Sequence, residues 1–268
     1  MKTESPAILT TYRSSIEFAP GAVTKRIAGE ERLRLLPTRH DSFINELRIG
    51  RLFAHVPPAV SFPRLLAADE EQRTLTFEVI GDGIALGEKY AANILLDDLD
   101  LVLSAACALG DFDMRRSWMY RPPVEEWIEH HREHGHLGAT EAALAVRAFG
   151  TAGEGRFAHG DLSPRNVLKR EDGSMVLIDW ERAGIYPAGF DLAFLWYTTG
   201  GVSGARAHVE AAVPPAQHPA FWLSLLLIAL LHADGSAQRG RRFDRTEASE
   251  TAAVIACLDS AMRGLGDA

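Results

Sequence analysis

FAHGDLSPRNVLKREDGSMVLIDWE, residues 157–181, is the most informative stretch of this chain. The segments NVL (166–168) and MVLI (175–178) are rich in β-forming residues and predict two short strands. Between them stands Asp172-Gly173, a preferred pair for a two-residue turn. The stretch is therefore expected to fold as a β-hairpin.

The open end of this hairpin carries side chains with oxygen ligands. If Asp172 and Gly173 form the loop, Asn166 lies opposite Asp179, and the Cβ atoms of such a pair are about 4.5–5.5 Å apart. This amide and carboxylate suit Mg²⁺, which takes one or two protein oxygens beside phosphates and water. Asp161, on the loop that enters the hairpin, is placed to orient a substrate hydroxyl or accept its proton. Each residue alone is more often structural, but together they favour a phosphate-transfer site.

The pattern HGDLSPRNVL (159–168) followed by VLIDWE (176–181) resembles the aminoglycoside phosphotransferase and choline kinase-like family. It is less similar to the eukaryotic protein kinases, which carry His-Arg-Asp and Asp-Phe-Gly at these places. The resemblance implies a bilobal protein-kinase-like fold. It also implies that Asp161 is the catalytic base and that Asn166 and Asp179 are the Mg²⁺ ligands.

Two supporting residues follow from the same resemblance. His159 would support the catalytic loop. Asp191, in GFDLAFL, matches the family's later Asp, which braces that loop through hydrogen bonds. Asp191 is also a candidate N-cap for the apolar helix that follows it, and both roles can hold together.

The N-terminal part matches the family more loosely. The family needs a strand Lys that contacts ATP phosphates and a helix Glu that holds it, and Lys25 and Glu46 are the candidates; an ordinary surface role is the alternative. Residues 78–80 (Glu78, Val79 and Ile80) stand where the family's interlobe hinge binds adenine through its backbone. No G-x-G-x-x-G precedes Lys25, which is a departure that bears on nucleotide affinity.

The order of predicted elements indicates an α+β chain with two lobes. Residues 1–80 are expected to form a small β-rich N-lobe, 81–83 the hinge, and 84–268 a larger helical C-lobe that contains the hairpin. Turn residues and alternation predict strands within 16–27 and over 74–80. Caps and apolar spacing predict helices over 41–55, 93–109, 123–134, 140–149, 189–199, 217–233 and 245–264.

Composition narrows the function classes. The net charge of −8 argues against general nucleic-acid binding, which needs clustered Lys and Arg. Two distant cysteines and the absence of a signal-like N-terminus indicate a cytoplasmic protein. The most apolar run, 221–231, is too short to span a membrane and is expected to be a buried helix.

We therefore expect a kinase that uses ATP (or GTP) and Mg²⁺ to phosphorylate a hydroxyl of a small molecule. An antibiotic or related natural product is the first candidate acceptor, and acids within 125–136 would suit a cationic one. A metabolic kinase for choline, a sugar, homoserine or a nucleoside is the alternative, as is a nucleotide-binding pseudokinase. His130 and His134 have a spacing that can chelate a metal, but a solvated helix face is the simpler interpretation.

Overall fold

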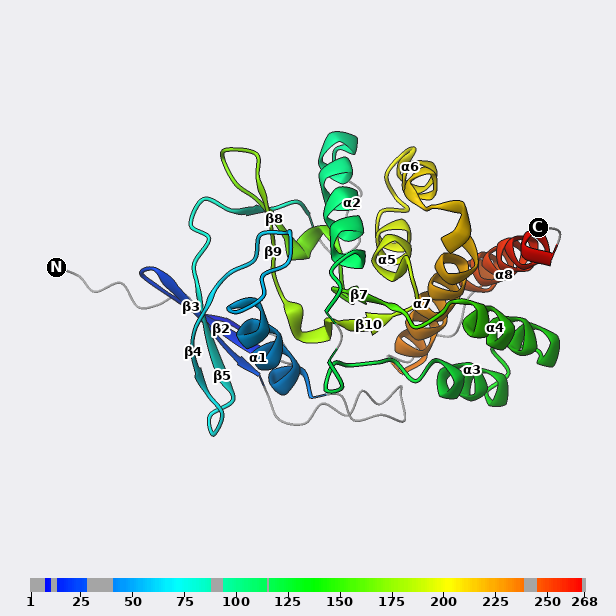
Figure 1. Cartoon of the computed structure of the whole chain (residues 1–268), viewed down its shortest axis with the longest axis horizontal. Helices are drawn as coiled ribbons and strands as arrows, with labels where there is room; N and C mark the ends of the chain where they lie inside the picture. Colours follow the sequence, from blue (N-terminus) through cyan, green and yellow to red (C-terminus); the bar gives the residue numbers. More distant parts are fainter. Residues whose placement is uncertain are drawn as a thin grey trace.

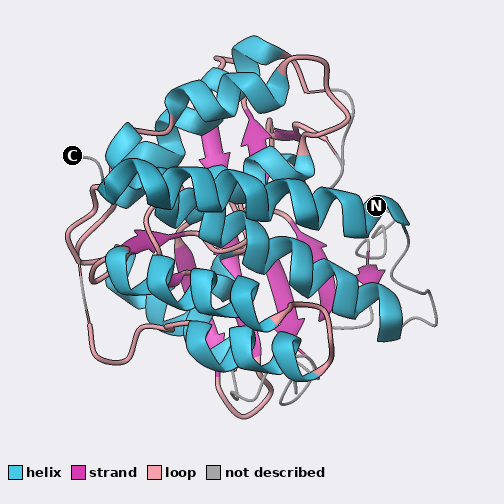
Figure 2. Cartoon of the chain, turned by 90° about the vertical axis from the view of Figure 1, so that its right-hand side faces the viewer, coloured by secondary structure: helices cyan, strands magenta, loops and turns pink. Residues whose placement is uncertain are grey.

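The computed structural model describes residues 8–10, 14–27, 41–87, 94–114, 116–238 and 245–266. Within them the chain has the expected α+β, two-lobed, protein-kinase-like arrangement. An antiparallel sheet with one helix occupies the left of Figure 1, and helices fill the right. Figure 2 looks onto the helical side, where long helices stand in front of the strands.

The N-lobe sheet has the strand order β1-β2-β3-β5-β4 and every neighbouring pair is antiparallel. Strands β2 and β3 are joined by the tight Pro20-Gly21 turn, where Gly21 has the positive φ of 77° that the second turn residue needs. The bounds are β1 Ile8–Thr10, β2 Ser14–Ala19, β3 Ala22–Ile27, β4 Leu65–Asp69 and β5 Thr74–Glu78.

Helix α1 (Ser42–Phe53) packs against this sheet and also reaches the C-lobe. Its N-cap is Asp41, whose carboxylate accepts a hydrogen bond from Ile44 N at 3.1 Å and pairs with both Nη atoms of Arg73. One side of α1 joins a small core with Ile27 and Leu75, and its C-terminal end joins the main core. The helix therefore connects the two lobes.

The C-lobe is mainly helical, and α7 is its central element. The side chains of Phe221, Leu223 and Leu225–Leu230 are buried, as expected of the run 221–231. No single helix among the described residues is long and apolar enough to cross a bilayer, although α6 and part of α7, bent by 101°, pass that test as a pair. The helices are α2 Leu96–Gly110, α3 Val124–Glu133, α4 Ala139–Thr151, α5 Phe190–Thr198, α6 Ala205–Ala212, α7 His218–Gln238 and α8 Arg245–Gly266.

Short strands lie between the N-lobe sheet and these helices. Strands β7 (Arg156–Ala158) and β10 (Gly184–Tyr186) pair with each other, on either side of the hairpin in sequence. Strand β6 (Ile84–Ala85) pairs with the hairpin strand β8 (Val167–Lys169), which pairs with β9 (Met175–Leu177). The chain that leaves the N-lobe is thus bonded directly to the hairpin.

The hairpin exists, but its predicted register is wrong by one residue. Ile178, and not Asp179, lies opposite Asn166, because Ile178 N donates to Asn166 O at 3.0 Å. The loop contains three residues: Arg170 pairs with Ser174, and Gly173 takes a φ of 81°. A three-residue loop with glycine in the left-handed region is the next most common hairpin connection after the two-residue turn.

All seven expected helices are confirmed, with ends that move by a few residues. Strands β1, β4, β6 and β10 and helix α6 were not predicted, because each is short and has weak periodicity. The β structure expected within residues 157–181 therefore continues to Tyr186, the end of β10. The placement of the lobe boundary at residues 81–83 stays a prediction.

Candidate active site

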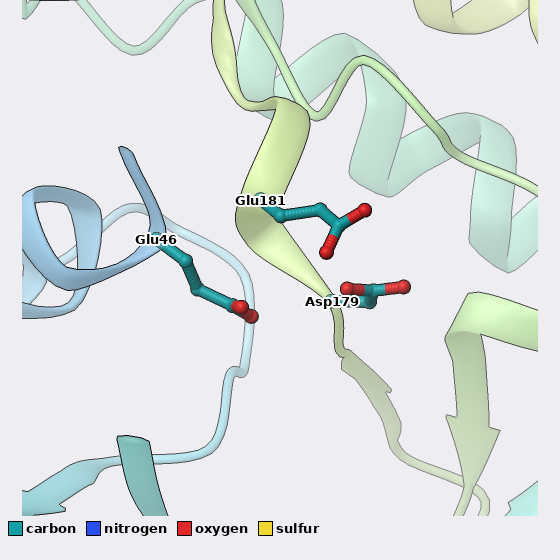
Figure 3. Close-up of side chains that lie close together, drawn as sticks. All are labelled: Glu46, Asp179 and Glu181. Atoms are coloured by element: carbon teal, nitrogen blue, oxygen red, sulfur yellow. The ribbon is translucent and has the colours of Figure 1, made fainter. Parts of the chain in front are cut away.

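Four charged side chains from distant parts of the sequence meet beside α1. Lys25 Nζ lies 2.5 Å from Asp179 Oδ1, 2.9 Å from Glu46 Oε2 and 2.9 Å from Glu181 Oε2. Figure 3 shows the three carboxylates turned toward one another. We refer to these four residues as the Lys25 cluster.

Each member is positioned by a different local structure. Lys25 is in the middle of β3, between Ile16 of β2 and Leu75 of β5. Glu46 is on the buried face of α1. Asp179 has φ 66° and ψ 63°, a left-handed conformation that ends the alternation of β9 and redirects the chain. The next residues form a short 3₁₀ helix, Trp180–Arg182, which brings Glu181 back toward Lys25.

Hydrogen bonds between side chains of α1 and backbone groups hold α1 against this turn. Trp180 N donates to Glu46 Oε1 at 3.2 Å. Asn45 Nδ2 donates to Glu181 O at 3.0 Å and to Ala183 O at 2.9 Å. The N-lobe helix and the segment after β9 are thereby connected by direct hydrogen bonds.

The cluster has more negative than positive groups. Burial alone lowers the pKa of Lys25, but the carboxylates of Asp179, Glu46 and Glu181 outweigh this and raise it well above its usual value. Burial, only partly offset by the Lys25 charge, raises the pKa of Glu46 to about 7. For Asp179 the effect of burial is overcome by Lys25 and by more distant positive charges, including Arg165, so its pKa falls.

This donor set suits a hard divalent cation. Among the described residues, Glu46, Asp179 and Glu181 offer ligand oxygens that all lie within 4.8 Å of one another. The Lys25 ammonium lies among these oxygens as a cation would, and it leaves an excess of carboxylate charge. Mg²⁺ prefers carboxylate oxygens, and a second cation relieves the cost of concentrating negative charge in a largely buried site.

The loop of residues 159–166, which we call the catalytic loop after the role that the resemblance implies, brings Asp161, Arg165 and Asn166 together. Asn166 Nδ2 donates to Asp161 O at 2.8 Å and, more weakly, to Asp161 Oδ2 at 3.4 Å. Arg165 Nη2 also donates to Asp161 Oδ2 at 3.4 Å. Pro164 begins a 3₁₀ turn, Pro164–Asn166, so these side chains are presented by a stiff segment of backbone.

His159 and Asp191 hold the backbone of this loop through hydrogen bonds. The two carboxylate oxygens of Asp191 accept hydrogen bonds from His159 N at 2.7 Å and Gly160 N at 3.0 Å. His159 Nε2 must donate to the carbonyl of Ile178, 2.9 Å away, which leaves Nδ1 as the acceptor for Asp161 N at 3.4 Å. These are the hydrogen bonds that the resemblance implies for Asp191. Its alternative role as N-cap of α5 is wrong, because that cap is Gly189.

Gly160 has a specific reason to be glycine. Its φ is 80°, and an added Cβ would lie 2.3 Å from the carbonyl oxygen of Arg182. Arg182 O also accepts a hydrogen bond from the Tyr186 hydroxyl at 2.7 Å. The catalytic loop and the turn after Asp179 therefore pack backbone to backbone.

The structure places the sequence-predicted site residues in three locations: the Lys25 cluster, the catalytic loop and the hinge. Lys25, Glu46 and Asp179 are in the Lys25 cluster, and Asn166 is bonded to Asp161 on the catalytic loop. Their roles in metal, nucleotide and proton binding stay predictions.

The third location is the hinge, at the end of β5. Glu78 pairs with Ala22, Val79 N donates to Gly21 O at 3.4 Å, and Ile80 O accepts from Gly83 N at 3.0 Å. Adenine binding by residues 78–80 stays a prediction. The segment between β1 and β2, residues 11–13, lies outside the described residues.

Glu181 is the site residue that sequence reasoning missed. It lies two residues after Asp179, and a strand alternation continued past Ile178 would have suggested the same face for both acids. The signal was present as two acids in D-W-E, but the local 3₁₀ turn that carries Glu181 to Lys25 was not foreseen.

Comparisons with known proteins place the chain in a family. The sequence profile of the phosphotransferase enzyme family matches residues 23–222, a span that contains every member of the Lys25 cluster and the whole catalytic loop. The chain belongs to this phosphotransferase family. No curated protein matches the sequence.

Solved structures similar to this phosphotransferase share its fold at low identity. Choline kinase LicA from Streptococcus pneumoniae has a TM-score of 0.65 at 14% identity, over 94% of each chain. A choline/ethanolamine kinase family protein from Mesorhizobium loti has 0.62 at 16%, over 97% of this chain and 88% of its own. An aminoglycoside phosphotransferase from Alicyclobacillus acidocaldarius has 0.56 at 14%, over 98% and 93%.

One pocket of the phosphotransferase lies away from these residues. Its volume is about 490 Å³, and it lies at the outer ends of β7 and β10. None of the site residues described above lines it, so it does not define the place of nucleotide or acceptor. Its walls include Phe112, Asp113, Glu154, Arg156, Phe157 and Ala188.

Proposed function

We propose that this phosphotransferase uses ATP and Mg²⁺ to phosphorylate a hydroxyl group of a small molecule. The observation that carries the proposal is the Lys25 cluster, in which one ammonium is surrounded by three largely buried carboxyl groups. An excess of buried negative charge is costly by itself. It becomes favourable when a divalent cation and its phosphates enter.

The residues divide the chemistry between them. Asp179 and Asn166 would hold Mg²⁺, and Glu181 is placed to assist them. When bound, the metal would neutralise charge on the phosphates. Lys25 would exchange part of its carboxylate contacts for phosphate oxygens. Asp161 would orient the acceptor hydroxyl and take its proton, so catalysis consists mainly of positioning and charge stabilisation.

A cationic natural product of the aminoglycoside type is the acceptor we propose first. The three carboxyl groups around Lys25, together with Asp161, create a negative local field, which would attract an amine-bearing substrate. Aminoglycosides and choline, the substrates named for similar folds, both carry positive charge and a hydroxyl. This shared chemistry supports a cationic acceptor, and a metabolic substrate such as choline is the alternative.

An acceptor screen tests the proposal. Purified protein is incubated with Mg·ATP and single compounds from a panel of aminoglycosides, choline, homoserine, sugars and nucleosides. ADP release is followed, and each positive compound is checked by mass spectrometry for one added phosphoryl group. The Asp161→Asn variant serves as the blank, because it keeps the shape of the side chain while losing the base.

The outcomes separate the candidates. Phosphorylation of cationic compounds only, lost in the blank, supports the proposal. Phosphorylation of neutral sugars or nucleosides would keep the kinase and reject the cationic acceptor. Mg·ATP binding without turnover on any compound would indicate a nucleotide-binding module in place of an enzyme. Absence of nucleotide binding would reject the function altogether.

A further inference from the structure

Arg165 stands out on the catalytic loop because it is exposed. From Phe157 to Val167 every residue is buried except Arg165. Its side chain is 45% exposed, whereas that of Asp161, to which it donates a hydrogen bond, is 4% exposed. The one side chain that this loop offers to an incoming molecule is therefore a guanidinium, and it lies over the proposed base.

An ordinary surface ion pair does not account for this arrangement. Exposed pairs contribute little to stability, and nothing in them requires a nearly buried partner. Asp161 already accepts a hydrogen bond from Asn166 Nδ2. Arg165 is therefore an exposed cation that is bonded directly to the proposed base.

Phosphoryl transfer is accelerated by a cation that meets the transferred group. Charge spreads over the three non-bridging oxygens of the γ-phosphoryl group as it moves, and an arginine that meets them accelerates the reaction. Lys25 is bound by three carboxylates, whereas Arg165 has five N–H donors and the structure gives one of them to Asp161. The remaining fork suits two phosphoryl oxygens.

We propose that Arg165 is a catalytic residue that donates hydrogen bonds to the transferred phosphoryl group while it holds Asp161. In the step, the acceptor oxygen forms a bond to the γ-phosphorus as the bond from that phosphorus to the bridging oxygen breaks. The electron pair of the broken bond remains on ADP, and the hydroxyl proton goes to Asp161. Arg165 binds the non-bridging oxygens of the γ-phosphoryl group most strongly in the transition state.

The inference rests on the proposed function, and one binding experiment distinguishes their failures without knowing the acceptor. The affinity for Mg·ADP is measured by calorimetry with and without tetrafluoroaluminate, an anionic mimic of the phosphoryl group in transfer. Wild type, Arg165→Ala and Arg165→Lys are compared. We expect Arg165→Ala to bind Mg·ADP normally and to lose about 10²–10³-fold of the affinity for the complex with tetrafluoroaluminate, and Arg165→Lys to lose less.

Arg132→Ala is the matched control. Arg132 is 43% exposed and pairs with Glu129 on its own helix, as Arg165 pairs with Asp161 on its own loop. This variant should bind both complexes like the wild type. Thermal melting of each variant shows whether it is folded.

Three results would overturn the inference. Arg165→Ala could bind both complexes like the wild type, or lose affinity equally for both, which would indicate a ground-state or structural role. A wild type that gains nothing from tetrafluoroaluminate would show that the site offers no donor to the moving group. Failure of the wild type to bind Mg·ADP at all would instead reject the proposed function, on which this inference stands.

Discussion

Two clusters of titratable side chains in this phosphotransferase are built in opposite ways. The Lys25 cluster combines β3, α1 and the turn after β9, which are up to 156 residues apart in sequence. The second cluster, which we call the histidine cluster, comes from one segment at the end of α3. Its rings lie 4.1–6.4 Å apart and belong to His130, His131, His134 and His136.

The two clusters differ in whether their buried side chains are charged or neutral. In the Lys25 cluster, Lys25 and Asp179 stay charged although both are largely buried, and three carboxyl groups face one ammonium. In the histidine cluster, burial and the neighbouring rings lower the pKa of His131 to about 3, so this side chain stays neutral. His131 is 1% exposed, whereas His134, for which a solvated helix face was expected, is exposed and His130 is half-buried. We infer that the first cluster is built for ligands and the second for packing.

Among the substitutions that test this comparison, the largest effect is expected at Asp161 on the catalytic loop. Asp161→Asn should lower kcat by about 10²–10⁴-fold, because the acceptor hydroxyl loses its general base. Nucleotide affinity and melting temperature should stay close to the wild type. Steady-state kinetics with the best acceptor measure this, and a variant with full kcat would remove Asp161 from the mechanism.

Lys25→Met should produce the next largest effect, on stability. The change leaves three carboxyl groups without their cation, and breaking a buried ion pair from one side costs about 3–5 kcal/mol. Urea denaturation measures the loss, with Arg132→Met as the control in an exposed pair, where no measurable change is expected. A Lys25→Met variant as stable as the wild type would show that the cluster is not held together by this charge.

Sequence reasoning captured the catalytic loop better than the Lys25 cluster. His159, Asp161 and Asn166 stand within eight residues, so one motif contains them and local structure keeps them together. The partners of Lys25 depend on how α1 packs against the turn after β9, which no local pattern encodes.

Sequence reasoning did not predict the hairpin register or the role of Glu181, and each failure has a physical reason. The hairpin register changed because Gly173 favours a three-residue loop over the two-residue turn. Glu181 was missed because Asp179 takes a left-handed conformation, and alternation no longer predicts which way the following side chains point. Short strands such as β6 have too few residues for any periodic signal.

A smaller effect, on the pH dependence of stability, is expected from His131 of the histidine cluster. The pKa of His131 is about 3 in the folded protein and near 6.5 when unperturbed, so below about pH 6.5 the unfolded chain binds a proton that the folded one does not. Stability should therefore fall as pH decreases, by up to about 1.4 kcal/mol per pH unit between these values.

His131→Asn should remove this part of the acid sensitivity and leave turnover at neutral pH unchanged. Melting temperatures at pH 7 and pH 5 measure it, with the exposed His134→Asn as control. An equal loss of stability in His131→Asn and wild type between the two pH values would contradict the neutral, buried histidine. Loss of turnover would contradict the division between the two clusters.

The most direct test of the central claim is the effect of Mg²⁺ on nucleotide affinity. Calorimetry of ADP binding is performed with Mg²⁺ and with a chelator for wild type, Asp179→Asn and Glu181→Gln. If the Lys25 cluster is a metal–nucleotide site, Mg²⁺ tightens binding to the wild type, Asp179→Asn loses this gain and Glu181→Gln loses part of it. Equal tightening by Mg²⁺ in all three proteins would contradict the account.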